Sequence, residues 1–120
     1  MKVLIADDSS ELRARVVEML SQFPDLDVIG EAGGVEDALA ALDNLLPDLV
    51  ILDLRMRDGS GIEVLRKLRR ASRGTKVIVF TNHPEEQYRR RCKELGANYF
   101  LSKSTDSDRL IEITRQLISR

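Results

Sequence analysis

Short apolar runs alternate along the chain with segments in which apolar residues recur every three or four positions. The runs are mostly continuous, as in parallel strands that are covered on both faces, and they occupy residues 3–6, 28–32, 49–54, 77–80 and 99–101. We therefore expect five strands in a sheet that needs helices on both sides.

The segments that follow the runs have the period of amphipathic helices. The first is expected to begin after a Ser9 or Ser10 cap. The apolar positions of the five segments are Leu12, Val16, Met19, Leu20 and Phe23; Val35, Ala38, Leu39 and Leu42; Ile62, Leu65 and Leu68; Tyr88, Cys92 and Leu95; and Leu110, Ile113 and Leu117. Strict alternation with short connections predicts right-handed crossovers, so the expected fold is α/β: a doubly wound (βα)5 sandwich of three layers around a parallel sheet.

Length and composition narrow the function classes that this fold serves. The chain has 120 residues, and we expect a single domain covering residues 1–120. Nineteen Lys and Arg residues against twenty Asp and Glu give a formal net charge of -1, so there is no overall attraction to nucleic acid or to a membrane surface. One cysteine, no apolar stretch of membrane-spanning length and a first strand that starts at Lys2, without room for a signal peptide, predict a cytoplasmic protein.

Polar side chains follow four of the five predicted strands. Asp7 and Asp8 end the first, Asp53 the third and Thr81 the fourth, and Lys103 comes just after the fifth. Ligands of doubly wound sheets bind at the carboxyl ends of the strands, so we expect these residues to meet. Singly, the first two aspartates read as helix caps and the threonine as the end of a strand. Together, three converging carboxylates repel one another unless a cation neutralises them.

This set of residues is suited to phosphoryl transfer. Oxygen ligands favour Mg²⁺, or Mn²⁺, and Asp53 is a feasible nucleophile toward phosphorus while it stays ionised. Lys103 can contact one phosphoryl oxygen through its charge, and Thr81 can donate a hydrogen bond to another.

Four motifs, in this order and spacing, resemble the receiver domains of bacterial response regulators, of which the chemotaxis receiver is a familiar member. They are VLIADDS at residues 3–9, LVILDLRMRDGSG at 49–61, VIVFT at 77–81 and GANYFLSK at 96–103. The resemblance covers essentially the whole chain. It implies the flavodoxin-like strand order 2-1-3-4-5 for the five predicted strands.

The resemblance also implies roles and partners. Asp53 would be the phosphoacceptor, contacted by Thr81 and Lys103, and the metal ligands would be Asp8, Asp53, the backbone carbonyl of Arg55 and, through water, Asp7. The phosphodonor would be a sensor histidine kinase or a phosphotransfer protein, and slow self-catalysed hydrolysis would reset the switch. The chain would then be a signalling protein that controls an output partner and not a metabolic enzyme.

Phosphorylation in this family moves a threonine and an aromatic residue together, here Thr81 and Phe100, and alters the surface of the fourth helix, fifth strand and fifth helix. Most relatives have Tyr where this chain has Phe100, so the ring keeps its steric role and the hydroxyl contact is lost. We expect weaker coupling. Tyr99 should point to the opposite face of the strand and is no substitute.

Other departures lie beside the predicted site. Arg57 replaces a common Pro near the metal loop, Asn82 replaces the Ala or Gly at the donor's entrance, and Ser104 replaces a Pro that follows a cis bond. A cis bond before Ser costs roughly 3 kcal/mol, so we expect a trans bond. Arg55 and His83 occupy positions that face the attacking water in this family and set phosphoryl lifetime, although the histidine reads equally well as a solvated loop residue.

Two surface features bear on partners. The fourth helix carries a basic run flanked by glutamates, made of Arg89, Arg90, Arg91 and Lys93. Without a nucleic-acid motif we interpret it as a solvated face that would suit an acidic protein partner and not as a nucleic-acid site. Ile111 and Ile118 lie beside the apolar stripe of the last helix, where they either widen the core or form a seam. An exposed seam would support a homodimer through the fourth helix, fifth strand and fifth helix.

Two other functions remain open from the residues alone. A small phosphatase with an aspartyl nucleophile would need an external substrate, and its second aspartate usually lies two residues after the first, whereas Asp7 and Asp8 are adjacent. A phosphorylation-independent interaction module with this fold is the second alternative. Intact Asp53, Thr81 and Lys103 argue against it.

Overall fold

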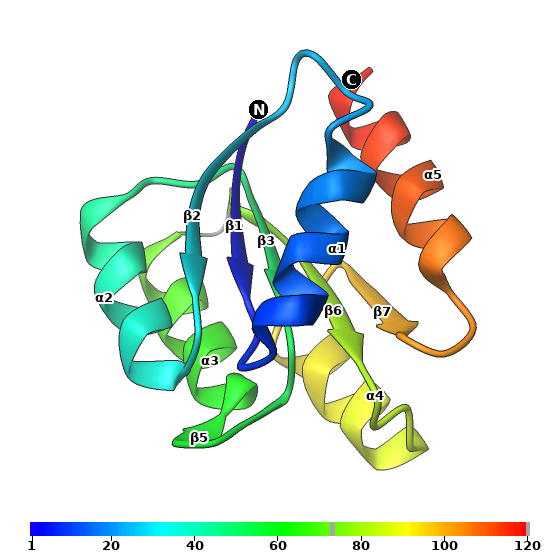
Figure 1. Ribbon diagram of the computed structural model, residues 1–120. Coiled ribbons are helices and arrows are strands. Elements are labelled where there is room, and N and C mark those ends of the chain that lie inside the picture. The colour runs from blue at the N-terminus through cyan, green and yellow to red at the C-terminus, as the bar shows by residue number, and fades with distance from the viewer. Residues whose placement is uncertain (73, 120) are drawn as a thin grey trace.

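The computed structural model describes residues 1–72 and 74–119 and contains a five-stranded parallel sheet (Figure 1). Its strand order is β2-β1-β3-β6-β7. The strands are β1 (Lys2–Ala6), β2 (Asp27–Ala32), β3 (Leu49–Leu52), β6 (Lys76–Thr81) and β7 (Tyr99–Ser102). Because β6 and β7 are the fourth and fifth of the expected strands, the predicted order 2-1-3-4-5 is confirmed.

Helices cover both faces of the sheet (Figure 1). One face packs against α1 (Ser10–Leu20) and α5 (Ser107–Ile118), and the other against α2 (Val35–Asn44), α3 (Gly61–Ala71) and α4 (Glu86–Glu94). None of the helices in the described part of the chain is long and apolar enough to cross a membrane. The three-layer α/β sandwich expected from the sequence is therefore present.

Each central strand supplies side chains to two separate cores. In β3, Val50 and Leu52 pack toward α2, α3 and α4, while Leu49 and Ile51 pack toward α1 and α5. All four are 3 % exposed or less, and full burial of such a side chain stabilises the fold by about 1.5–3 kcal/mol. The continuous apolar runs of the sequence thus follow from burial on both faces.

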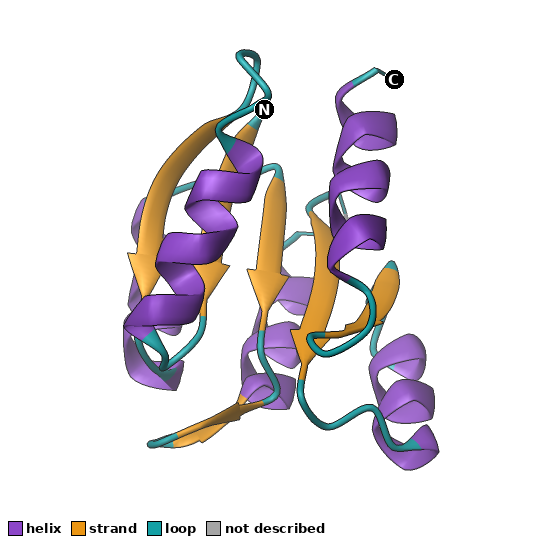
Figure 2. Ribbon diagram, turned by 45° about the vertical axis from the view of Figure 1, so that its right-hand side comes forward, coloured by secondary structure: helices purple, strands orange, loops and turns teal. Residues whose placement is uncertain are grey.

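The chain after β3 departs from the prediction. The third strand ends at Leu52 and not at residue 54, and β4 (Arg55–Met56) and β5 (Gly59–Ser60) form a small antiparallel hairpin that was not expected. Figure 2 shows this hairpin beyond the carboxyl ends of the sheet. Gly59 has a φ of +150°, which a residue with a side chain rarely adopts, so the Asp58-Gly59 turn depends on glycine.

The structure settles several local predictions. Ser9 is the cap of α1, because its hydroxyl accepts a hydrogen bond from the Leu12 amide at 3.1 Å. Phe100 packs toward α2, α3 and α4 while Tyr99 packs toward α1 and α5, which confirms their opposite directions.

The bond before Ser104 is trans, since the described residues contain no cis peptide. Cys92 is buried in the core as expected, and burial raises the pKa of its thiol to about 11.

Candidate functional site

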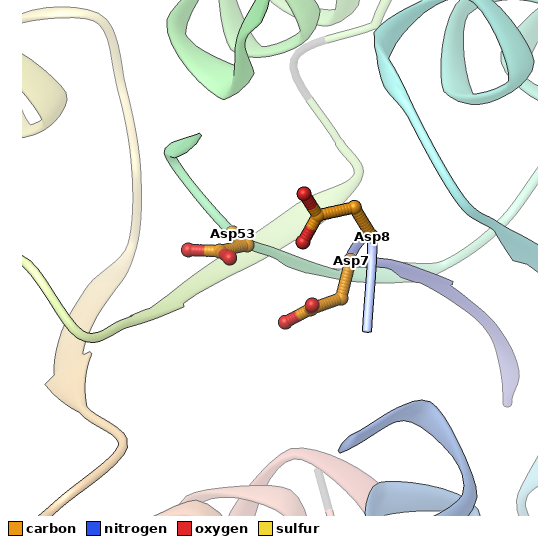
Figure 3. A group of neighbouring side chains, drawn as sticks. All are labelled: Asp7, Asp8 and Asp53. Carbon is orange, nitrogen blue, oxygen red and sulfur yellow. The ribbon is translucent and has the colours of Figure 1, made fainter. Parts of the chain in front are cut away.

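Three carboxylates meet at the carboxyl ends of β1 and β3 (Figure 3). Asp7, Asp8 and Asp53 each offer an oxygen atom that lies within 4.8 Å of the others. Asp7 and Asp53 are 5 % and 7 % exposed, and Asp8 is half-buried. The strand ends thus bring together the three acidic residues that were predicted to meet.

Lys103 places an ammonium group inside this acidic cluster. Its Nζ lies 2.5 Å from Asp7 Oδ2 and 3.0 Å from Asp53 Oδ2, and its side chain is 8 % exposed. The backbone amide of Lys103 donates to the Thr81 carbonyl at 2.9 Å, which fixes the residue beside the end of β6. One ammonium neutralises one of the three carboxylates, so the described site keeps an excess of negative charge that favours a divalent cation.

Backbone groups hold the acidic side chains in place. The Ser9 amide donates to Asp7 Oδ1 at 2.9 Å, and the Leu54 amide donates to Asp53 Oδ1 at 2.8 Å. Arg13 of α1 donates to the Asp7 carbonyl at 2.6 Å and pairs with Glu31 of β2 at 3.1 Å. Arg13 was not predicted to be part of the site, because its role depends on the distance between α1 and β2 and not on a motif.

Thr81 and Phe100 lie on the same face of the sheet. Phe100 is paired with Val79, two residues before Thr81 on β6, and side chains alternate along a strand. Thr81 is fully buried, and its hydroxyl accepts a hydrogen bond from the His83 amide at 3.1 Å. His83 is half-buried in the loop that leads to α4, and Asn82 is exposed.

The Arg55 side chain contacts α4. Its Nη2 donates to Tyr88 Oη on α4 at 2.7 Å, and its guanidinium carbon lies 5.7 Å from the centre of the tyrosine ring. The hydrogen bond to Tyr88 raises the pKa of this guanidinium above its usual range. The family resemblance predicts that this side chain lies near the attacking water once the site is phosphorylated, and in the structure, which holds no phosphoryl group, it lies against α4. Tyr88 was expected only as an apolar position of the helix.

The side chain of Asp58 caps α2, because the residue that precedes this helix has no side chain to do so. The residue before α2 is Gly34, and the Asp58 carboxylate in the β4–β5 turn accepts from the Val35 and Glu36 amides at 2.8 and 3.2 Å. A Cβ at Gly34 would lie 2.8 Å from Asp58 Oδ1, so glycine leaves room for the contact. The cap ties the hairpin that follows Asp53 to the start of α2.

Loss of this cap should lower stability in a pH-dependent way. Hydrogen bonds from the two amides hold the pKa of the Asp58 carboxyl below its usual range. The stabilising contribution of the cap is therefore fully present above the unfolded-state pKa of about 3.9. It is lost as pH falls through the lower pKa of the folded state. We expect Asp58→Ala to have a lower melting temperature than the parent at pH 6, and the difference to shrink in strongly acidic buffer.

Thermal unfolding followed by circular dichroism between pH 2 and 7 measures this difference. Asp37→Ala removes another acidic residue from the first turn of α2 and is the matched control. Equal melting temperatures for Asp58→Ala and Asp37→Ala at pH 6 would show that the cap does not stabilise the fold.

A family model for the response regulator receiver domain matches residues 3–115. The chain belongs to this family. Response regulator GacA of Pseudomonas aeruginosa is 32% identical to it over 119 residues, covering 99% of this chain and 56% of that protein. The nitrate/nitrite response regulator NarL of Escherichia coli is 34% identical over 116 residues, covering 95% and 53%. This receiver domain therefore spans about half the length of the curated relatives it matches.

Solved receiver domains share the fold closely. The signal receiver domain of a DNA-binding response regulator from Colwellia psychrerythraea superposes with a TM-score of 0.92 at 25% identity, covering 100% of this chain and 99% of that one. The response regulator domain of Thermotoga maritima CheB gives a TM-score of 0.88 at 25% identity, covering 100% and 97%. These similarities place the chain among the signalling proteins of two-component systems and confirm its flavodoxin-like receiver fold.

Proposed function

We propose that this receiver domain is a switch that is activated when Asp53 accepts a phosphoryl group from a sensor histidine kinase or a phosphotransfer protein. The observation that carries the proposal is the cluster of three carboxylates at the carboxyl ends of the strands, two of which, Asp7 and Asp53, are bridged by Lys103. Buried carboxylates that share a single ammonium contribute little to the stability of the fold, because the cost of removing the charges from water offsets much of their attraction. They suit a site that binds a metal and a phosphoryl group.

The residues present fit a hard divalent cation, Mg²⁺ or Mn²⁺. Their side-chain donors are carboxylate oxygens, the ligand type that such ions prefer. The proposed ligands are Asp8, Asp53, the backbone carbonyl of Arg55 and, through water, Asp7. When bound, the ion would offset the negative charge of the phosphoryl oxygens.

The protein's own groups supply the remaining steps. A carboxylate oxygen of Asp53 forms the bond to phosphorus as the bond to the donor's leaving group breaks. Lys103, already 3.0 Å from Asp53 Oδ2, moves with its charge onto a phosphoryl oxygen. The Thr81 hydroxyl accepts from the His83 amide, which leaves its own proton free to be donated to another phosphoryl oxygen. Asn82 and His83, which directly follow Thr81 in the chain, would influence donor access and phosphoryl lifetime.

The output would be a change in the surface made by α4, β7 and α5. As Thr81 moves toward the phosphoryl group, Phe100 on the same face of the sheet would follow into the vacated space, although without the hydroxyl that a tyrosine would add. Ile111 and Ile118 are half-buried and lie outside both core clusters, which supports this surface as the site of an output protein or of a second copy of the chain. We propose that residues 1–120 act as one such domain in the cytoplasm.

Incubation with Mg²⁺ and acetyl phosphate tests the proposed acceptor. We expect intact-mass analysis to detect one added phosphoryl group on the parent and none on Asp53→Asn, because the amide is not a nucleophile toward phosphorus. Asp43→Asn, which changes an exposed carboxylate of α2, should be labelled like the parent. An unlabelled parent, or a labelled Asp53→Asn, would contradict the proposed function, and steady release of phosphate from simple phosphate esters would favour a phosphatase.

A further inference from the structure

Arg55 and α4 are joined across a shallow hollow beside the phosphorylation site. The hollow has a volume of about 330 Å³, and its lining includes Arg55 on one side and Tyr88 on the other. The guanidinium donates to the tyrosine oxygen and lies against its ring. Arg55 is exposed and is only two residues from Asp53, so its long side chain is able to swing between α4 and the acidic site without disturbing the core.

The contact with Tyr88 suits the unmodified state of the protein. With Asp53 unmodified, the neutral phenol oxygen of Tyr88 is an adequate acceptor. A phosphoryl group on Asp53 adds negative charge and three strong acceptor oxygens. Guanidinium groups bond such oxygens with two parallel hydrogen bonds, which are stronger than one bond to a neutral oxygen. A phosphoryl group on Asp53 therefore competes with Tyr88 for the Arg55 guanidinium.

We propose that Tyr88 is a positioning residue that holds Arg55 on α4 in the unmodified protein, and that the phosphoryl group draws Arg55 away. This inference rests on the proposed function, because it needs a phosphoryl group at Asp53. Under this proposal the tyrosine contact and the phosphoryl contact exclude each other, so the tyrosine lowers the apparent affinity of the site for a phosphoryl group.

Release of Arg55 also frees α4. Of the nine residues of this helix only Cys92 is fully buried, and Glu85 at its start makes no side-chain cap. The next residue after Tyr88 is Arg89, whose guanidinium lies 4.7 Å from the centre of the Phe100 ring and donates to the Phe100 carbonyl at 3.3 Å. Adjacent residues of a lightly anchored helix thus contact the loop after Asp53 and the switch residue Phe100. Breaking the Tyr88 contact would let α4 move with the switch residue.

The affinity for beryllofluoride, a phosphoryl mimic, tests the inference. Titration calorimetry with Mg²⁺ present should show that Tyr88→Phe binds the mimic about fivefold more tightly than the parent, the factor that corresponds to one net hydrogen bond. The ring remains, so α4 should keep its packing, and thermal unfolding verifies this. Arg55→Met should bind the mimic more weakly and should abolish the effect of Tyr88→Phe in the double variant.

Tyr99→Phe is the matched control, because Tyr99 lies on the opposite face of β7 and away from Arg55, and we expect it to bind like the parent. A parent that does not bind beryllofluoride would contradict the proposed function itself. A parent that binds normally, together with equal affinity in Tyr88→Phe, would overturn only the role of Tyr88. A Tyr88→Phe gain that persists in the Arg55→Met background would also overturn it.

Discussion

Replacing Lys103 with methionine is expected to reduce the rate of Asp53 phosphorylation by roughly a hundredfold while tightening the binding of Mg²⁺. The ammonium lies between Asp7 and Asp53 and is nearly buried, so methionine removes its charge and keeps much of its volume. Loss of one preorganised group that stabilises transition-state charge typically costs on the order of 10²–10³ in rate. The affinity for Mg²⁺ should rise because the ammonium of Lys103 no longer repels the cation. Two unit charges ~4 Å apart interact by roughly 4 kcal/mol at an effective dielectric of ~20.

Acetyl phosphate labelling followed by intact mass gives the rate for Lys103→Met, and titration calorimetry gives the Mg²⁺ affinity. Lys93→Met changes an exposed lysine on α4 and should leave both quantities at the parent's values. If Lys103→Met bound Mg²⁺ more weakly than the parent, the ammonium would not be competing with the metal for the carboxylates. Labelling at the parent's rate would remove Lys103 from the proposed chemistry.

The arrangement of the strands was predictable because burial on both faces leaves a pattern in the sequence. In β3 every residue from Leu49 to Leu52 is buried, and a run without polar positions excludes a strand with one solvated face. The same topology made the acidic cluster predictable, since parallel strands all end at the same edge of the sheet. Asp8, Asp53 and Lys103 lie far apart in the chain, and their meeting required only the strand order.

Features set by side-chain direction or by very short elements were missed. The hairpin of β4 and β5 has strands of two residues, too short for any period, and only the Asp58-Gly59 dipeptide is a hairpin signal. The contact between Arg55 and Tyr88 depends on where α4 lies beside the loop after β3. Sequence spacing carries no information on that distance, so the contact with Tyr88 was not predicted, and the influence of Arg55 on phosphoryl lifetime stays a prediction.

Gly61→Ala should be the most damaging single-methyl substitution beside the site. A Cβ at Gly61 would lie 2.0 Å from the Asp53 carbonyl oxygen and 3.0 Å from its carbonyl carbon. Both are backbone atoms, so the clash cannot be relieved by rotating a side chain. The Gly61 amide also donates to the Leu54 carbonyl at 2.8 Å, which holds the start of α3 against this segment. Overpacking typically costs about 1–3 kcal/mol and occasionally more, and we expect about 3 kcal/mol or more here because backbone must shift.

Thermal unfolding measures the result as a melting temperature lowered by on the order of 10 °C, since each kcal/mol shifts a domain of this size by about 4 °C. Relief of the clash displaces Asp53, so phosphorylation by acetyl phosphate should fall even at temperatures where Gly61→Ala is folded. Gly74→Ala is the matched control, because a Cβ there lies within 4 Å of none of the atoms that the structure describes beyond its chain neighbours, and it should change neither quantity. A Gly61→Ala protein as stable as Gly74→Ala would mean that the Asp53 backbone is not held against the start of α3, and the rigid placement of the acceptor would have to come from elsewhere in the fold.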